Sequence, residues 1–294
     1  MRIVFVGCVE FSRHALEKVL QLGGNVVGIC TLGASAFNAD HSDLGDIAKR
    51  QAIPCLDVAD LNATESIEWL KAQQPDVVFC FGWSRLLKRE FLSIPALGVV
   101  GFHPAALPMN RGRHPLIWAL VLGLKETGST FFFMDEGADS GDILSQEVVS
   151  ISENDNAHSL YQKITATALR QIHDFLPKLC DGSFAAKRQN PSLVNYWRKR
   201  HRADGIIDWR MSSQSIHNLV RGLTKPYVGA SFIHNGVEFK VWKTELIAEA
   251  PLNIEPGRVL RAGVGDGHVV KCGEGAIRLL HIEPDFLFTS GTCL

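Results

Sequence analysis

The sequence predicts an α/β protein with a doubly wound, mostly parallel, Rossmann-like sheet, followed by a second, smaller β-barrel-like domain. Three observations predict this fold. Apolar runs of strand length alternate with segments of helical periodicity through residues 1–181. Residues 182–203 then contain several Lys and Arg and no carboxylate, which is typical of a surface linker. Short strand-like runs separated by Gly turns fill residues 205–294.

The alternation in the first domain begins at residues 2–8, a short apolar run with β character. Residues 11–24 have apolar side chains at helical spacing and end in Gly-Gly, a helix stop signal. The same two patterns predict strands at 25–32, 75–82, 98–103, 129–135 and 143–151, and helices at 43–53, 64–73, 114–123 and 156–179. The run 75–82 is apolar throughout, as in a strand buried on both faces. The run 143–151 alternates, so we expect it at a sheet edge.

We therefore divide the chain into a catalytic domain at 1–181, a linker at 182–204 that runs over the first domain, and an OB-like domain at 205–294. The last part contains a helical pattern at 212–223 and five or six short strands. Asn235-Gly236 is a strong hairpin turn signal between two of these strands.

Composition excludes several classes of protein. The formal net charge is −1, from 30 Lys and Arg against 31 Asp and Glu, which argues against a surface built wholly for nucleic acid. No apolar run reaches the roughly 18 residues that a membrane helix needs, and the first residues form a strand instead of a signal peptide, so we expect a cytoplasmic protein. The 7 cysteines form no C-x-x-C pair and the histidines no zinc motif, which predicts free thiols and no metal.

The most informative residues are His103 and Asp139. A strand that ends at His103-Pro104 places the imidazole at the carboxyl edge of a parallel sheet, where open α/β folds bind ligands. Asp139 lies in a loop opened by Gly137 and closed by Gly141, which can bring a carboxylate against the imidazole. Such a pair can take a proton from an attacking amine. Taken alone, a His-Pro turn and an Asp in a Gly loop are also ordinary turn formers.

The order of these residues resembles the active site of enzymes that transfer a formyl group from 10-formyltetrahydrofolate to an amine. The matching motifs are His103-Pro104, Leu107-Pro108, Arg111-Gly112 and Asp135-x-Gly137-x-Asp139-x-Gly141. Residues 205–294 are similar, less closely, to the C-terminal domain of methionyl-tRNA formyltransferases and two-domain sugar formyltransferases, through IDW, VRGL-x-x-P-Y and FKVWK.

The resemblance implies that His103 and Asp139 are the catalytic residues and that N10-formyltetrahydrofolate is the co-substrate. It also implies a folate cleft, lined largely by backbone, along residues 81–87 and 133–139. The expected folate-binding residues are Phe81, Gly82, Trp83, Leu87, Met134, Asp135, Gly137 and Asp139.

Gly101 departs from the family, which has Asn two positions before the histidine to donate a hydrogen bond to the formyl oxygen. A backbone N–H, a bound water or Asn110 are candidate replacements, and a branch that works without the donor is a further alternative. Losing one such donor typically lowers the rate by ~10²–10³, which slows an enzyme without abolishing it. We therefore expect an active enzyme over a weak or silent homologue that binds nucleotide sugars or folate.

The acceptor amine is predicted from charge. The stretch 31–46 has three Asp and no Lys or Arg, whereas methionyl-tRNA formyltransferases carry a basic insertion there. This favours the amine of a nucleotide-linked amino sugar, used for surface polysaccharide, and keeps methionyl-tRNA as the alternative. A diphosphate needs cations and a base needs stacking. The expected substrate-binding residues are Arg111, Arg113, Tyr196, Trp197 and Arg202, although a solvated linker explains the last three as well. Assembly into a homodimer is a further open alternative.

Overall fold

The computed structural model describes residues 1–33, 40–263 and 267–294. The chain forms two compact units. The first consists of Met1–Pro115, Thr127–Val149 and Gln162–Trp197, and the second of Leu116–Glu126, Ser150–Tyr161 and Arg198–Leu294. The main boundary, after Trp197, lies inside the expected linker. Two short segments of the expected first domain belong to the second unit.

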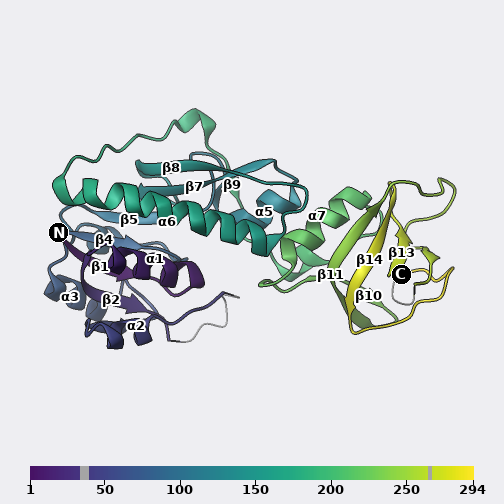
Figure 1. The fold of residues 1–294 in the computed structure, drawn as a ribbon, viewed down its shortest axis with the longest axis horizontal. Coiled ribbons are helices and arrows are strands. Elements are labelled where there is room, and N and C mark those ends of the chain that lie inside the picture. The colour runs from purple at the N-terminus through teal and green to yellow at the C-terminus, as the bar shows by residue number, and fades with distance from the viewer. Residues whose placement is uncertain (34–39, 264–266) are drawn as a thin grey trace. The chain divides into compact units, whose positions relative to one another are not determined.

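The first unit is built on a seven-stranded sheet with the order β3-β2-β1-β4-β5-β7-β8 (Figure 1). Its strands are β1 (Arg2–Val6), β2 (Asn25–Thr31), β3 (Cys55–Asp57), β4 (Val77–Cys80), β5 (Val99–His103), β7 (Glu126–Phe133) and β8 (Ile143–Ser150). β1 pairs in parallel with β2 and β4, β2 with β3, and β4 with β5, while β7 is antiparallel to β5. The predicted fold class is confirmed, and β8 lies at the sheet edge as expected.

Helices cover both faces of this sheet. They are α1 (Glu10–Gln21), α2 (Gly45–Arg50), α3 (Thr64–Gln73), α4 (Arg89–Leu92) and α6 (Ala157–Asp181). A further helix, α5 (Pro115–Val121), lies almost wholly in the second unit. On one face an aromatic cluster joins the sheet to α1 and α6: Phe11 of α1 lies 4.2 Å from Phe102, and Phe175 of α6 lies 4.9 Å from Phe131, between ring centroids. On the other face Leu70 of α3 and Phe91 of α4 are buried against β1, β4 and β5. Burial on both faces explains the continuous apolarity of β4.

The segment after α6 returns along the first unit. Lys187 pairs through its backbone with Ile143, and β9 (Tyr196–Trp197) pairs in parallel with β6 (Arg111–Gly112). The expectation that the linker runs over the first domain is confirmed for this part of it. Two short 3-10 turns, Pro191–Leu193 and Arg202–Gly205, flank β9 in the chain.

The second unit contains a five-stranded antiparallel sheet with the order β10-β11-β14-β13-β12. Its elements are α7 (Ser213–Leu223), β10 (Ala230–His234), β11 (Val237–Ile247), β12 (Val259–Arg261), β13 (His268–Lys271) and β14 (Ala276–Glu283). The apolar face of α7, with Ile216 and Leu219, shares one core with Phe232 and Phe239 of the sheet. The predicted hairpin turn at Asn235-Gly236 joins β10 and β11, and both residues have positive φ.

Several short elements were not predicted. β3, α4, β6 and β9 have two to four residues each, too few for a periodic pattern to be recognised. All 7 cysteines are free thiols, and Cys8, Cys30, Cys80 and Cys272 are buried. Burial raises the pKa of Cys272 to about 12. Within the described ranges, no helix is both long and apolar enough to cross a membrane.

Candidate active site

His103 is the last residue of β5, at the carboxyl end of the strand. The strands on either side, β4 and β7, shield it, and it is only 5% exposed. Pro104 follows directly and turns the chain away from the sheet. The parallel neighbour β4 ends at Cys80 on the same edge and leads into residues 81–87. The sheet edge predicted to hold the site therefore brings together the carboxyl ends of two adjacent strands.

Both ring nitrogens of His103 have partners. Nε2 lies 2.8 Å from the carbonyl oxygen of Asn110, and Nδ1 lies 3.5 Å from Oδ2 of Asp139. A carbonyl oxygen can only accept a hydrogen bond, so Nε2 carries the hydrogen in the neutral ring. Nδ1 is then the basic nitrogen, and it faces the carboxylate. A proton that binds to Nδ1 can therefore be hydrogen-bonded by the carboxylate of Asp139.

Asp139 is fixed by its loop. Its φ is +55°, a left-handed conformation that a non-glycine residue adopts only when the surroundings hold it there. The Oδ2 atom accepts a hydrogen bond of 2.9 Å from the backbone N–H of Gly112. The side chain of Gln189 donates to the carbonyls of Asp139, at 2.8 Å, and Gly141, at 2.7 Å. These hydrogen bonds hold the loop and the Asp139 carboxylate in the position that faces His103.

Arg111 stabilises the same loop through Gln189. It is buried, and its Nε and Nη2 donate to Oε1 of Gln189 at 3.2 and 2.6 Å. Its Nη1 donates to the hydroxyl of Tyr196 at 3.1 Å. The sequence suggested Arg111 and Tyr196 as substrate ligands. In the structure Arg111 orients Gln189, which in turn orients the backbone of Asp139.

Asn110 lies next to the His103–Asp139 pair and is fixed by Asn195. Its backbone N–H donates to Oδ1 of Asn195 at 2.7 Å, and its own Oδ1 accepts from Nδ2 of Asn195 at 3.1 Å. The two bonds determine which way the Asn110 amide points. Its Nδ2 has no hydrogen-bond acceptor in the part of the chain that the structure describes. The backbone carbonyl of Asn110 therefore binds the His103 imidazole, while its side-chain Nδ2 offers an amide donor.

The position of the missing family Asn is filled from the neighbouring segment. A Cβ built at Gly101 would lie 2.8 Å from Cγ and 3.0 Å from Sδ of Met134, and 3.1 Å from Phe132. Met134 follows β7 and its backbone N–H bonds to Val99, so its side chain is held over Gly101. The thioether of Met134 therefore occupies the space that a side chain at position 101 would need.

The two expected folate-binding stretches meet in one cluster. Trp83, Leu87 and Met134 pack against the same buried residues of β4 and β5. Phe81 and Leu87 are buried, and the backbone N–H and carbonyl of Phe81 bond to Val6 and Ser12. The Asp135 carboxylate is turned inward to Gly137 and Ser140. Nε1 of Trp83 is buried and has no acceptor among the described residues. An apolar wall with an unpaired indole N–H suits the flat, acceptor-rich pterin ring of a folate.

The remaining expected ligands lie in different places. Arg113 donates to the carbonyl of Ser84 at 2.5 Å, which ties the turn after β6 to residues 81–87. Trp197 pairs through its backbone with Gly112. Arg202 belongs to the second unit, where it forms an ion pair of 2.5 Å with Glu238. Hydrogen bonding from Lys240 is the largest cause that lowers the pKa of Glu238 to about 2.

Gln189 and Asn195 were missed by the sequence analysis. Each contacts the site through side-chain amides, from a segment that had the composition of a linker. Neither residue type carries a distinctive chemical signal by itself. Their separation from Asp139 and Asn110 is 50 and 85 residues, too far for a local pattern to reveal.

The fold and site together define a group-transfer enzyme of the open α/β class, with a buried His–Asp pair at the carboxyl edge of the sheet. A formyl transferase family model matches residues 1–175, and a model of the formyl transferase C-terminal domain matches residues 199–285. The chain belongs to this family, and it is a formyltransferase that uses 10-formyltetrahydrofolate. The predicted co-substrate is confirmed.

Its similarity to individual proteins covers both units. A methionyl-tRNA formyltransferase from Caldanaerobacter subterraneus is 32% identical over 97% of this chain and 93% of its own length. The crystal structure of WlaRD, a sugar 3N-formyl transferase, matches with a TM-score of 0.73 at 17% identity, over 97% of this chain and 99% of that one. A methionyl-tRNA formyltransferase from Clostridium thermocellum matches with a TM-score of 0.63 at 16% identity, over 84% and 94%. At these identities the solved structures support the fold alone.

Proposed function

We propose that His103 and Asp139 are the catalytic residues and that the acceptor is a primary amine. The observation that carries this proposal is the buried contact of 3.5 Å between Nδ1 of His103 and Oδ2 of Asp139. 10-Formyltetrahydrofolate supplies the formyl group. The attacking amine forms a bond to the formyl carbon and loses a proton, the bond between that carbon and N10 of the folate breaks, and tetrahydrofolate leaves with a proton on N10. His103 and Asp139 accept the proton of the amine at Nδ1 and the carboxylate, because Nε2 is already bound to the carbonyl of Asn110.

The amide of Asn110 has the role of the missing donor in this proposal. Its Nδ2 is unused by the described residues and its direction is fixed by Asn195. A preorganised donor of this kind stabilises the negative charge that develops on the formyl oxygen. Gly101, with Met134 over it, contributes no donor from a side chain.

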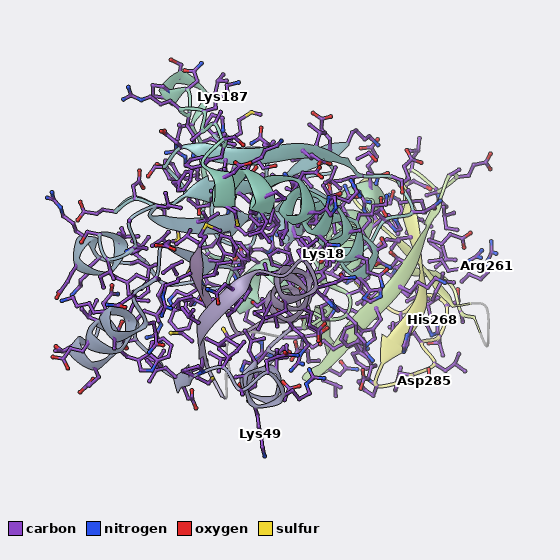
Figure 2. The ribbon with its side chains drawn as sticks, turned by 60° about the vertical axis from the view of Figure 1, so that its left-hand side comes forward. Lys18, Lys49, Lys187, Arg261, His268 and Asp285 are labelled. Carbon is purple, nitrogen blue, oxygen red and sulfur yellow. The ribbon has the colours of Figure 1, made fainter. Side chains whose placement is uncertain are left out.

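For the acceptor, we propose the amino group of methionyl-tRNA. Full-length similarity supports this choice, since curated relatives at 29–32% identity over 96–97% of the chain are methionyl-tRNA formyltransferases. Charge distribution supports it as well. Residues 182–294 contain 15 Lys and Arg against 10 Asp and Glu, although the whole chain has a net charge of −1. Phosphate contacts need such an excess of cations. Arg261, at the end of β12, is one exposed member of this set (Figure 2).

A nucleotide-linked amino sugar, as used for surface polysaccharide, is the second candidate. One observation favours it: the stretch 31–46 contains no Lys or Arg. In its described part, Arg13 of α1 donates to Asp46 and to the carbonyl of Asp43, so the nearest cation is neutralised. Residues 34–39 of this stretch lie outside the described residues. The exposed Lys49 of α2, in the first unit, points away from the ribbon (Figure 2). It lies after the stretch 31–46 in the chain and so does not add a cation to that stretch.

A comparison of the two acceptors, with variants of His103 and Asp139, tests both the acceptor and the catalytic pair. The purified chain is incubated with 10-formyltetrahydrofolate and either methionyl-tRNA or a panel of nucleotide-linked amino sugars, and formylated product is measured by mass spectrometry. We expect product with methionyl-tRNA, and rates reduced by at least ~10² in His103→Gln and Asp139→Asn. His14→Gln, an exposed histidine on α1, is the matched control. Product with an amino sugar and none with tRNA would transfer the function to the second candidate, and full activity of both variants would refute the catalytic pair.

A further inference from the structure

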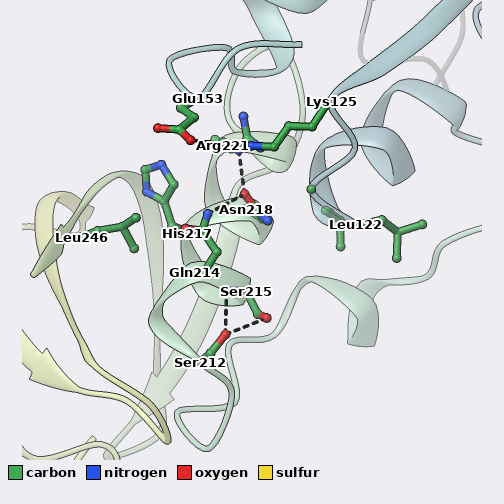
Figure 3. A pocket seen from close by; sticks show the side chains of 12 residues that line it. Leu122, Lys125, Glu153, Ser212, Gln214, Ser215, His217, Asn218, Arg221 and Leu246 are labelled. Carbon is green, nitrogen blue, oxygen red and sulfur yellow. Dashed lines mark hydrogen bonds and ion pairs between the residues drawn. The ribbon is translucent and has the colours of Figure 1, made fainter. Parts of the chain in front are cut away.

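The second unit contains a cavity of about 450 Å³ that the formyl-transfer chemistry does not use. It lies beside α7, between the turn that follows α5 and the loop that carries Glu153 (Figure 3). Polar side chains predominate on its wall. The ones that matter here are Lys125, Glu153, His217, Asn218 and Arg221. All of them belong to the second unit, so the cavity is complete within that unit.

Asn218 supplies the strongest sign of a ligand. Its side chain is only 6% exposed, and its Oδ1 accepts hydrogen bonds from Nε of Arg221, at 2.9 Å, and Nε2 of Gln214, at 3.2 Å. Arginine can only donate, so these bonds fix the orientation of the amide. Its Nδ2 then carries two N–H groups that have no acceptor within the described residues. This donor is therefore available to a molecule that enters the cavity.

Gly123 leaves this amide uncovered. A Cβ at position 123 would lie 2.8 Å from Nδ2 of Asn218, and the residue has a φ of +68°. Any side chain there would both strain the backbone and cover the donor. The turn after α5 therefore keeps the Asn218 amide open to the cavity.

Three basic side chains from two segments, α7 and the turn after α5, surround the same space. His217 uses Nδ1 in a hydrogen bond of 2.9 Å with Thr244, and its Nε2 has no partner in the described parts of the chain. Nη1 of Arg221 is held by the carbonyls of Ser152 and Asp155 at 3.1 and 2.9 Å, which fixes its charge beside the cavity. Lys125 lies 3.6 Å from Glu153, but both are at least 78% exposed, so this pair is weak and Lys125 is free to exchange partners.

We propose that this cavity is a phosphate-binding subsite, with Asn218 Nδ2, His217 Nε2 and Lys125 Nζ as donors and Arg221 as a fixed positive charge. Directional N–H donors combined with cations are the means by which proteins hold phosphate oxygens. Two cations against one carboxylate leave the cavity positive. The choice of phosphate over another anion rests on the proposed function, because a tRNA and a nucleotide-linked sugar both carry it.

The surroundings of His217 do not by themselves favour its charged form. Burial, and then the charge of Arg221, lower the pKa of His217 below its usual value of 6.5. An anion in the cavity acts in the opposite direction by stabilising the imidazolium. Glu153, Lys125 and Arg221 are the charged residues that line the cavity, and the carboxylate of Asp155, which does not line it, also acts on Arg221.

The test is direct binding, without any acceptor or formyl transfer. Inorganic phosphate is titrated into the ¹⁵N-labelled full chain, and NMR follows the side-chain amide signals of Asn218 together with the backbone amide signals of the residues that line the cavity. In Asn218→Asp the backbone signals alone report binding. We expect saturable shifts of these signals and dissociation constants at least tenfold higher in Asn218→Asp and Lys125→Gln. Lys243→Gln, which removes an exposed lysine of β11 outside the cavity, should bind as the parent does. Lys125 is exposed, so its variant remains informative if Asn218→Asp fails to fold.

Each outcome has one meaning. Absence of saturable shifts at Asn218, or unchanged affinity in both variants, would overturn the subsite. Binding that depends on Asn218 and Lys125 supports it whichever acceptor the enzyme uses. A KM for methionyl-tRNA that rises in Lys125→Gln, with kcat unchanged, identifies the acceptor as the source of the phosphate. An unchanged KM together with phosphate binding identifies a free phosphate compound. Failure to formylate tRNA concerns the proposed function alone, because the titration contains no acceptor.

Discussion

Met134 occupies the space above Gly101, with its Cγ 2.8 Å from the point where a Cβ would stand at position 101. The two residues are complementary, because Gly101 has no side chain and Met134 fills the volume that one would take. The family's asparagine cannot be restored at position 101 without moving Met134.

This relationship predicts a strong coupling between the two positions. Gly101→Asn alone should lower the free energy of unfolding by about 1–3 kcal/mol, because an extra side chain is forced into filled space. In Gly101→Asn/Met134→Ala the new side chain has room, so the effects should depart from additivity by at least about 1 kcal/mol. Urea denaturation of both single variants and the double variant measures this cycle. Additive effects would mean that Met134 moves aside without cost.

Asn110 gives a prediction about catalysis. Asn110→Asp keeps the shape, tolerates the φ of +63° and still accepts from Asn195, but it removes the Nδ2 donor. If that donor stabilises the formyl oxygen, kcat should fall by ~10²–10³ with little change in the KM for folate. Steady-state kinetics at saturating acceptor measures the two constants separately. Asn235→Asp, at a left-handed asparagine (φ +49°) in the β10–β11 turn, is the control, and an equal loss there would point to a general effect.

Gln189 should be a positioning residue for Asp139. Gln189→Leu removes the bonds to the carbonyls of Asp139 and Gly141 and leaves buried Arg111 without its Oε1 acceptor. Hydrogen bonds to charged groups contribute about 1.5–3 kcal/mol, so we expect the free energy of unfolding to fall by roughly that amount. Gln189→Glu retains the acceptor for Arg111 but loses the donors to the loop. It should therefore recover stability more than kcat, and a parallel recovery of both would argue against the positioning role.

Asp46 makes the stretch after residue 39 sensitive to acid. Hydrogen bonding from Arg13 is the largest of the effects that lower the pKa of Asp46 to about 2. A carboxyl group whose folded pKa is depressed adds stability above its unfolded pKa of about 3.9 and loses it as the pH falls towards 2. A carbon-13 NMR titration should show Asp46 titrating near 2, and returning close to 3.9 in Arg13→Gln. An unshifted titration in the parent chain would mean that the Arg13–Asp46 pair is not populated in solution.

Much of the site was predictable because its signals are local. His103 follows an apolar run that can only be a strand, and Pro104 ends it, so the imidazole had to lie at the carboxyl edge of the sheet. Asp139 stands between two glycines that allow a tight loop. The motif that includes them then identified the family. The role of Arg111 was predicted less well, because a buried arginine and a substrate-binding arginine look the same in a sequence.

The sequence by itself determined the alternation of strands and helices, the edge of the sheet that holds the site, the His103–Asp139 pair and the folate co-substrate. The first three follow from periodicity and from motif spacing, which act over a few residues, and the co-substrate follows from the resemblance of the motif to a known family. Only the tertiary structure decided that Gln189 orients the loop of Asp139 and that Asn195 orients Asn110. It also decided that Met134 covers Gly101 and that Gly123 leaves Asn218 open to a cavity. Those contacts join segments 33 to 95 residues apart, and chain packing rather than local pattern brings them together.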